Sequence, residues 1–172
     1  MLMGWDFRGL YCQGTGANRA RLAADPLIRG RFAHIAAGES PEHRLPPGGL
    51  LVVHGFGPRA GDVPWELFGA GRAPAWTGDL PAEHRPPGGL LAWMRGFGAP
   101  VVLYQCQMSA GTVERESSIL SGHRAVLRGR DPVNPLLALL LALGATPDPQ
   151  RFSWYFKPHE QHLAEPLLQP GE

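Results

Sequence analysis

Residues 101–120 constrain the fold of this chain more than any other stretch of its sequence. The first half, residues 101–108, is nearly all apolar, which is typical of a strand at the centre of a sheet. The second half, residues 112–120, alternates apolar and polar side chains, as a strand with one face in water does. A short Ser-Ala-Gly sequence separates the halves, so the stretch predicts a β-hairpin. Its second strand would hold the carboxylates of Glu114 and Glu116 on the water-exposed face.

Breakers and apolar spacing predict the remaining elements. Further strands are expected at residues 5–11, 50–53 and 123–127. Helices are expected after Asn18, after Asp25-Pro26, at 62–69, from Leu90 to Gly96, from Asp131-Pro132 to Gly144, and at 159–168. In the second of these helices, Ile28, Phe32 and Ile35 would share one face. The helix around residues 136–143 is apolar on all sides, which predicts that it lies inside the core.

Length and composition indicate one domain spanning residues 1–172. A chain of 172 residues is long enough to bury a core without disulfides or a metal. Its 23 Gly and 18 Pro residues predict many loops, whereas a hydrophobic content of 44% argues against disorder. We therefore expect a loop-rich α+β single domain, in which a mostly antiparallel sheet is flanked by helices.

One phrase appears twice, within residues 38–57 and 78–98. Both copies contain Glu-His-Arg, then Pro-Pro-Gly-Gly-Leu-Leu, then Gly-Phe-Gly. Two copies are too few for a solenoid, which needs about three. The repeat predicts a duplicated structural unit inside the domain; the alternative is that a Pro- and Gly-rich composition produced both copies by chance. Homologous copies should fold alike, yet the first favours a strand and the second a helix.

Charge and cysteine content limit the classes of partner and the cellular compartment that we expect for this chain. The 16 basic and 15 acidic residues leave a net charge of +1, so we expect neither nucleic acid nor an anionic membrane as a partner. The longest apolar stretch, residues 135–145, is shorter than the roughly 18 residues that span a bilayer. Two Cys residues are too few for a disulfide scaffold, and the N-terminus does not resemble a signal peptide, so we expect a cytoplasmic location.

Candidate catalytic and metal-binding groups are few, and each has a structural alternative. Cys106 could pair with a histidine as a nucleophile, but its place in an apolar strand is more typical of an inert core residue. His159 and His162 could supply two metal ligands, but no third ligand is evident nearby, and a solvated helix explains them. Glu114 and Glu116 could act as paired carboxylates, although a polar strand face explains both. We therefore assign no catalytic residue, no metal and no cofactor.

Several conspicuous side chains could serve either binding or packing. His43 and His84 hold matching positions in the two copies of the repeated phrase, and we expect both in exposed loops rather than in a functional pair. Three tryptophans could anchor a partner surface or fill the core, and core packing is the more usual role. These are Trp65, Trp76 and Trp93.

The second half of the chain resembles small bacterial immunity proteins. The segments concerned are Gly98–Tyr104, Ser109–Gly111, Glu114–Glu116, Asn134–Leu137 and Leu141–Gly144. In those proteins a strand of the form G-x-P-V-x-Y-Y precedes a glycine turn and a charged strand, and a late helix with an N-x-x-L start and an L-G end closes the domain. The resemblance implies a non-enzymatic protein that binds a toxin made by the same or a neighbouring cell and blocks its active site.

The leading hypothesis from the sequence is therefore a non-enzymatic protein whose partner is a cognate bacterial toxin. The expected partner-binding residues are Trp65 as an aromatic anchor, its neighbour Glu66, and the acidic pair Glu114 and Glu116 facing a basic cleft. Two alternatives stay open. One is a small cytoplasmic hydrolase or transferase that uses Cys106 or a His–carboxylate pair, and the other is a structural subunit of an assembly.

Overall fold

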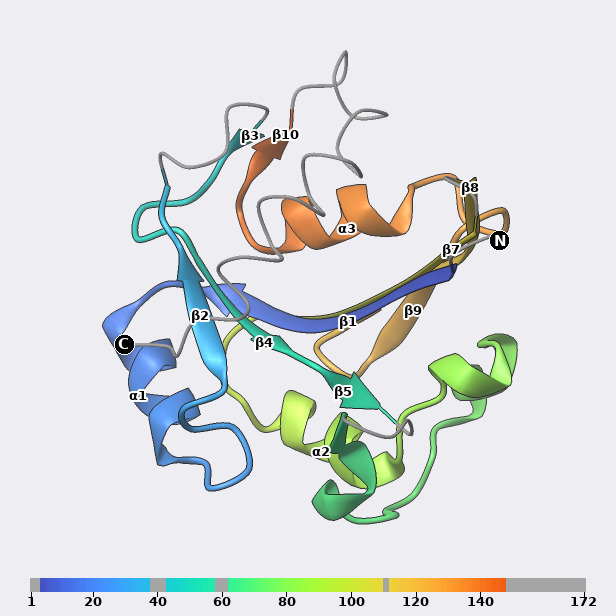
Figure 1. Ribbon diagram of the computed structural model, residues 1–172, viewed down its shortest axis with the longest axis horizontal. Coiled ribbons are helices and arrows are strands. Elements are labelled where there is room, and N and C mark those ends of the chain that lie inside the picture. Colours follow the sequence, from blue (N-terminus) through green and yellow to red (C-terminus); the bar gives the residue numbers. More distant parts are fainter. Residues whose placement is uncertain (1–3, 38–42, 58–61, 110–111, 148–172) are drawn as a thin grey trace.

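A six-stranded antiparallel sheet forms the centre of the molecule, in a computed structural model that describes residues 4–37, 43–57, 62–109 and 112–147 (Figure 1). The strand order is β2-β4-β1-β7-β8-β9, and every neighbouring pair is antiparallel. The strands are β1 (Gly4–Gln13), β2 (Phe32–Ile35), β4 (Leu50–His54), β7 (Val101–Ser109), β8 (Thr112–Leu120) and β9 (Arg124–Leu127). The expected α+β class is confirmed.

Shorter elements surround this sheet. The two small pairs are β3 (His43–Arg44) with β10 (Thr146–Pro147), and β5 (Phe56–Gly57) with β6 (Val63–Pro64). The helices are α1 (Gly16–Ala24), α2 (Gly88–Arg95) and α3 (Pro135–Ala142), and the 3-10 turns are η1 (Trp65–Phe68), η2 (Ala75–Asp79) and η3 (Ala82–His84). Within the described ranges, no helix has the length and apolar character needed to cross a membrane.

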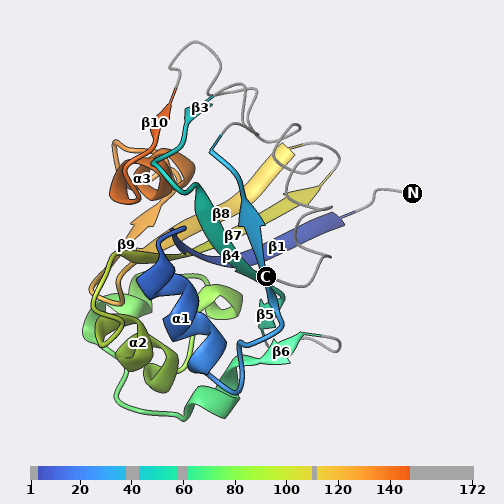
Figure 2. The ribbon, with the colours of Figure 1, turned by 90° about the vertical axis from the view of Figure 1, so that its left-hand side faces the viewer.

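Helix α3 covers one face of the sheet, while α1 and α2 lie on the other (Figures 1 and 2). Because successive side chains of a strand point to opposite faces, β1 contributes to both layers of core. Leu10 and Cys12 join the cluster under α1 and α2, whereas Phe7 and Tyr11 join the cluster under α3. The sheet is therefore buried on both sides along its central strands.

The hairpin expected at residues 101–120 is present as β7 and β8. Its register shifts once: Gln107 lies opposite Arg115, but Met108 lies opposite Val113. Glu114 is therefore the extra residue of a β-bulge and has no partner in β7. The bulge interrupts the regular alternation on which the sequence prediction for Glu114 and Glu116 rested.

The prediction of a helix after Asp25-Pro26 is wrong. The Asp25 carboxylate accepts a hydrogen bond from the Leu27 N–H at 2.8 Å and opens a turn instead, and Gly30 then adopts a φ of +74°. The chain continues as β2, which pairs with β4. The spacing of Ile28, Phe32 and Ile35 suits a helix, but pairing with a buried neighbouring strand outweighs this local preference.

Two helix starts also differ from their expected positions. Helix α1 is capped by Thr15, whose side chain accepts from the Asn18 N–H at 3.1 Å, while Asn18 itself is buried within the helix. Helix α3 begins only after Asn134, which caps it by accepting from the Leu136 N–H at 2.8 Å. Leu141 of α3 is 56% exposed, so the expectation that this helix is enclosed on all sides is wrong. The helix expected at 159–168 lies outside the described residues.

The two copies of the repeated phrase fold differently. The Leu-Leu of the first copy begins strand β4, and the Leu-Leu of the second lies in helix α2, each as its local pattern predicts. The phrase therefore does not mark a repeated structural unit. A shared origin of the two copies stays a prediction.

Candidate functional site

A row of polar side chains crosses the centre of the sheet on the face toward α2. Arg8 of β1 lies opposite Gln105 of β7, and Gln105 lies opposite Ser117 of β8. All three are buried, with exposed fractions of 6%, 0% and 0%. Polar groups inside a core need hydrogen-bond partners, because water is not available there.

Turn η3 supplies several of these partners. The Arg8 Nε donates to the Gln105 Oε1 at 3.0 Å, and the Gln105 Nε2 donates to the His84 carbonyl at 2.8 Å. The Arg8 Nη2 donates to the Glu83 carbonyl, and the His84 Nδ1 lies 3.0 Å from the Ser117 Oγ. Together these bonds tie η3 to three strands.

His84 is therefore not the exposed loop residue that the sequence predicts. Its side chain is buried with an exposed fraction of 2%, and it contacts a strand residue 33 positions away in the chain. The sequence offers one usable sign of this row, namely Gln105 within the nearly all-apolar stretch of residues 101–108. The side chain of His43, its counterpart in the first copy, lies outside the described part of the structure.

The His84–Ser117 contact has the composition and distance of a base–nucleophile pair. Catalysis by such a pair also requires that a substrate reach the hydroxyl. Ser117 has no exposed surface and lies in the second-last strand of the sheet, beneath η3. The pair is therefore placed to hold η3 in position rather than to attack a substrate.

A second polar group lies on the opposite face of the same strands. The Tyr104 hydroxyl donates to the Glu116 Oε2 at 2.5 Å, and the Arg128 guanidinium lies 3.5 Å from the Glu116 Oε1. Burial raises the pKa of Glu116 above its ordinary value, although the bonds from Tyr104 and Arg128 oppose this shift. Burial likewise raises the pKa of Tyr104 well above its ordinary value.

Glu116 is therefore not on a water-exposed strand face, and this part of the sequence prediction is wrong. Its exposed fraction is 4%, whereas Glu114, in the bulge, is exposed. The hypothesis of two carboxylates side by side in water does not hold for a pair in which one member is enclosed. Glu114 alone remains available to a partner.

Trp65 is a core residue rather than a surface anchor. It is 3% exposed, and the Arg8 guanidinium carbon lies 5.7 Å from the centre of its ring. Its neighbours in η1 behave differently, because Glu66 is exposed and Leu67 is 60% exposed. Trp76 and Trp93 are half-buried and pack against the same core cluster as Trp65.

The four residues expected to bind a partner do not form one cluster. The sheet lies between Trp65, which packs with α2 on one face, and Glu116, which bonds to Tyr104 on the other. Glu66 and Glu114 are the two that reach the surface.

The two cysteines lie in different core layers and are not joined by a disulfide. Cys106 is 1% exposed within β7, as expected of a core residue. Burial raises the pKa of Cys12 to about 12, so its reactive thiolate form is scarce. Within the described ranges, no three His, Cys, Asp or Glu side chains gather closely enough to hold a metal ion, while His159 and His162 lie outside those ranges.

No family model, curated protein or solved structure matches this chain. The resemblance to immunity proteins therefore stays a prediction, and the placement of the side chains is the remaining guide to function.

Proposed function

We propose that this chain is a non-enzymatic binding protein that neutralises a bacterial toxin by one-to-one association. One observation carries the proposal: the residues of the candidate site that are suited to covalent or acid–base chemistry are enclosed in the core. Cys106, Ser117, His84 and Glu116 are each at most 4% exposed. A substrate could reach them only after parts of the sheet or of η3 had moved, whereas a binding protein needs only its surface.

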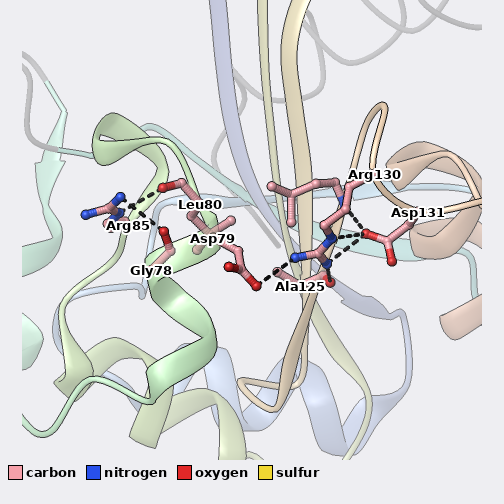
Figure 3. A network of polar contacts seen from close by, with 8 residues as sticks. Gly78, Asp79, Leu80, Arg85, Ala125, Arg130 and Asp131 are labelled. Atoms are coloured by element: carbon pink, nitrogen blue, oxygen red, sulfur yellow. Dashed lines mark hydrogen bonds and ion pairs between the residues drawn. The ribbon is translucent and has the colours of Figure 1, made fainter.

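The surface best suited to a partner is the segment of residues 64–79, which contains η1 and η2. It lacks regular strands or long helices between these turns, yet it is fixed at both ends. Trp65 anchors one end in the core, and Thr77 is buried near the other, where its hydroxyl donates to the Pro74 carbonyl at 2.7 Å. Just beyond the segment, the Arg85 Nη2 donates to the Gly78 carbonyl at 3.3 Å, and the Arg85 Nε donates to the Leu80 carbonyl at 2.8 Å (Figure 3).

A surface loop that is already ordered suits recognition, because binding then costs less conformational entropy. Glu66 and Leu67 stand out from this fixed segment as an acidic and an apolar side chain next to each other. They match a partner with a basic rim beside an apolar pocket. Leu67 would fill the pocket as the buried anchor, and Glu66 would attract the basic rim.

The test is binding to the product of the neighbouring reading frame, measured by co-purification and then by calorimetry. We expect a one-to-one complex that silences the neighbour's toxicity. Leu67→Asp should weaken binding by about 2 kcal/mol or more, as loss of a central apolar contact does. Glu66→Arg should mainly slow association. Glu83→Arg is the matched control, because Glu83 is also exposed and acidic but bonds to Arg8 through its backbone carbonyl alone.

The outcomes separate the class of protein from the location of its surface. Full affinity in both Glu66→Arg and Leu67→Asp would remove the 64–79 segment from the interface while leaving the binding function standing. Turnover of a small substrate that is lost in a folded Cys106→Ser variant would instead replace the binding class by the hydrolase or transferase alternative.

A further inference from the structure

Strand β9 is an outer strand of the sheet, and its outward edge is covered by the turn that follows it instead of another strand. An outer strand normally presents unpaired N–H and C=O groups that can pair with a strand of another molecule. The Arg128 N–H, just after β9, donates to the Glu116 carbonyl of β8. Because the two sides of an antiparallel strand alternate, Ala125 and Leu127 turn their backbone groups away from β8.

The turn that follows β9 takes up three of these outward groups. The Arg130 Nη2 donates to the Ala125 carbonyl at 2.6 Å (Figure 3). The Leu127 N–H donates to the Asp131 Oδ2 at 2.9 Å. The Leu127 carbonyl accepts from the Asp131 backbone N–H at 3.1 Å. Arg130 and Asp131 thus make the same kinds of bonds that a neighbouring strand would make.

Further contacts fix this pair in place. The Arg130 Nε donates to the Asp131 Oδ2 at 2.8 Å, and the Arg130 Nη1 lies 3.1 Å from the Asp79 Oδ2 at the end of η2. The guanidinium therefore bridges the strand edge, the turn after it and the 64–79 segment. The hydrogen bond from Leu127 is also the largest cause of the lowered pKa of Asp131.

The charges along β9 oppose self-pairing as well. If β9 paired antiparallel with β9 of a second copy, so that Ala125 of one copy faced Leu127 of the other, Arg124 would face Arg128. Like charges directly opposite each other destabilise a strand pair. Both arginines are exposed, and the Arg128 guanidinium also lies 3.5 Å from the Glu116 Oε1, which offsets part of its charge.

We propose that Arg130 and Asp131 form an edge guard, which prevents β9 from pairing with β9 of a second copy and so keeps the chain monomeric. The repulsion between Arg124 and Arg128 reinforces the guard. This inference is independent of the proposed toxin-binding function, because it concerns the opposite end of the 64–79 segment from Glu66 and Leu67.

The guard is tested by removing first the repulsion alone and then the repulsion together with both guard side chains. We expect the wild type and Arg124→Thr to be monomers, because the second keeps the guard and loses only the repulsion. The triple variant Arg124→Thr/Arg130→Ala/Asp131→Ala should form a dimer, seen as a twofold rise in mass by light scattering at high concentration. Arg29→Ala, an exposed arginine in the turn before β2, is the control for loss of surface charge.

Hydrogen exchange at the Leu127 amide separates edge pairing from general loss of stability. In the triple variant this amide should exchange rapidly in dilute solution and become protected as the concentration rises. Exchange of the amides in β1 should stay slow throughout if the fold is intact. A triple variant that stays monomeric, or an Arg124→Thr variant that dimerises as strongly as the triple variant, would overturn the proposal. So would a dimer whose Leu127 amide stays unprotected.

Discussion

Two glutamines on the same strand show how context decides the effect of a buried polar side chain. Gln105 bridges the Arg8 guanidinium and the His84 carbonyl and has no exposed surface. Gln107, two residues later, has a buried side-chain oxygen that accepts no hydrogen bond from the described residues. The two side chains are chemically identical, so replacing each by Leu shows how much the hydrogen bonds of Gln105 contribute to the free energy of unfolding.

Gln105→Leu should therefore lower the free energy of unfolding by about 3 kcal/mol, because it removes a partner of a buried guanidinium. Gln107→Leu should change it by less than about 1 kcal/mol, or raise it, because an unsatisfied buried oxygen is removed. Urea unfolding of the two variants measures both values. Equal losses would mean that the row of Arg8, Gln105 and Ser117 contributes no more than its packing.

The carboxyl of Glu116 should make stability depend on pH. Its pKa is raised in the folded chain, mainly by burial, from an ordinary value of 4.5. As the pH rises above that value, the unfolded chain loses this proton first, so the folded state loses stability relative to the unfolded state until the folded pKa is passed. Glu116→Gln cannot titrate and still accepts a bond from Tyr104.

We therefore expect the stability of the wild type, relative to Glu116→Gln, to fall as the pH rises from about 4.5 toward neutrality. Thermal unfolding of both proteins across this range measures the difference. Glu114→Gln removes one acidic charge from the same strand at an exposed position and serves as the matched control. A relative stability that rises with pH would mean that the bonds from Arg128 and Tyr104, rather than burial, determine the pKa of Glu116.

At the scale of elements, the two Pro-Pro-Gly-Gly segments of the repeated phrase differ in structure, but both require a residue without a side chain. In the first copy, a side chain on Gly49 would lie 1.9 Å from the Ile35 carbonyl oxygen, at the start of β4. In the second copy, a side chain on Gly89 would lie 2.1 Å from the Phe68 carbonyl oxygen, at the start of α2. Glycine allows two backbones to approach closely in both segments. In the first segment β4 approaches β2, and in the second α2 approaches η1.

Gly89→Ala should consequently destabilise the protein by more than about 2 kcal/mol, because η1 or α2 must move to admit the methyl group. Gly16 begins α1 and meets nothing within 4 Å, so Gly16→Ala is the matched control. We expect the control to raise the free energy of unfolding by about 0.5 kcal/mol, since it restricts the unfolded chain. A Gly89→Ala variant as stable as the wild type would show that this contact is loose.

Elements with strong local patterns could be predicted from the sequence, and elements set by distant partners could not. The alternation and apolar runs of β7 and β8 identify the hairpin without knowledge of its neighbours, as does Leu50–Val53 for β4. β2 takes its conformation from pairing with β4, and its own spacing suggests a helix. His84 is placed by a strand residue 33 positions away, and the bulge at Glu114 interrupts the alternation before Glu116. No local pattern therefore reveals the burial of His84 or of Glu116.

At the scale of the whole molecule, the sheet separates two core layers, and each layer contains one buried cysteine. Cys12 lies in the layer under α1 and α2, and Cys106 lies in the layer under α3. Polar contacts on both faces involve β7 and β8: Gln105 and Ser117, together with Arg8 of β1, on one face, and Tyr104 and Glu116 on the other. Opening either face would therefore disturb the strands that support the other.

If residues 1–172 form one cooperative domain, both cysteines should become reactive only when the whole molecule unfolds. We expect single-cysteine variants, Cys12→Ala and Cys106→Ala, to be alkylated with the same urea dependence and the same protection free energy, within about 0.5 kcal/mol after correction for each variant's stability. Mass spectrometry of the alkylated chain measures the rates. Earlier labelling of Cys106 than of Cys12 would mean that α3 detaches from its face on its own. A partner would then be able to reach the Tyr104–Glu116 pair without unfolding the rest of the sheet.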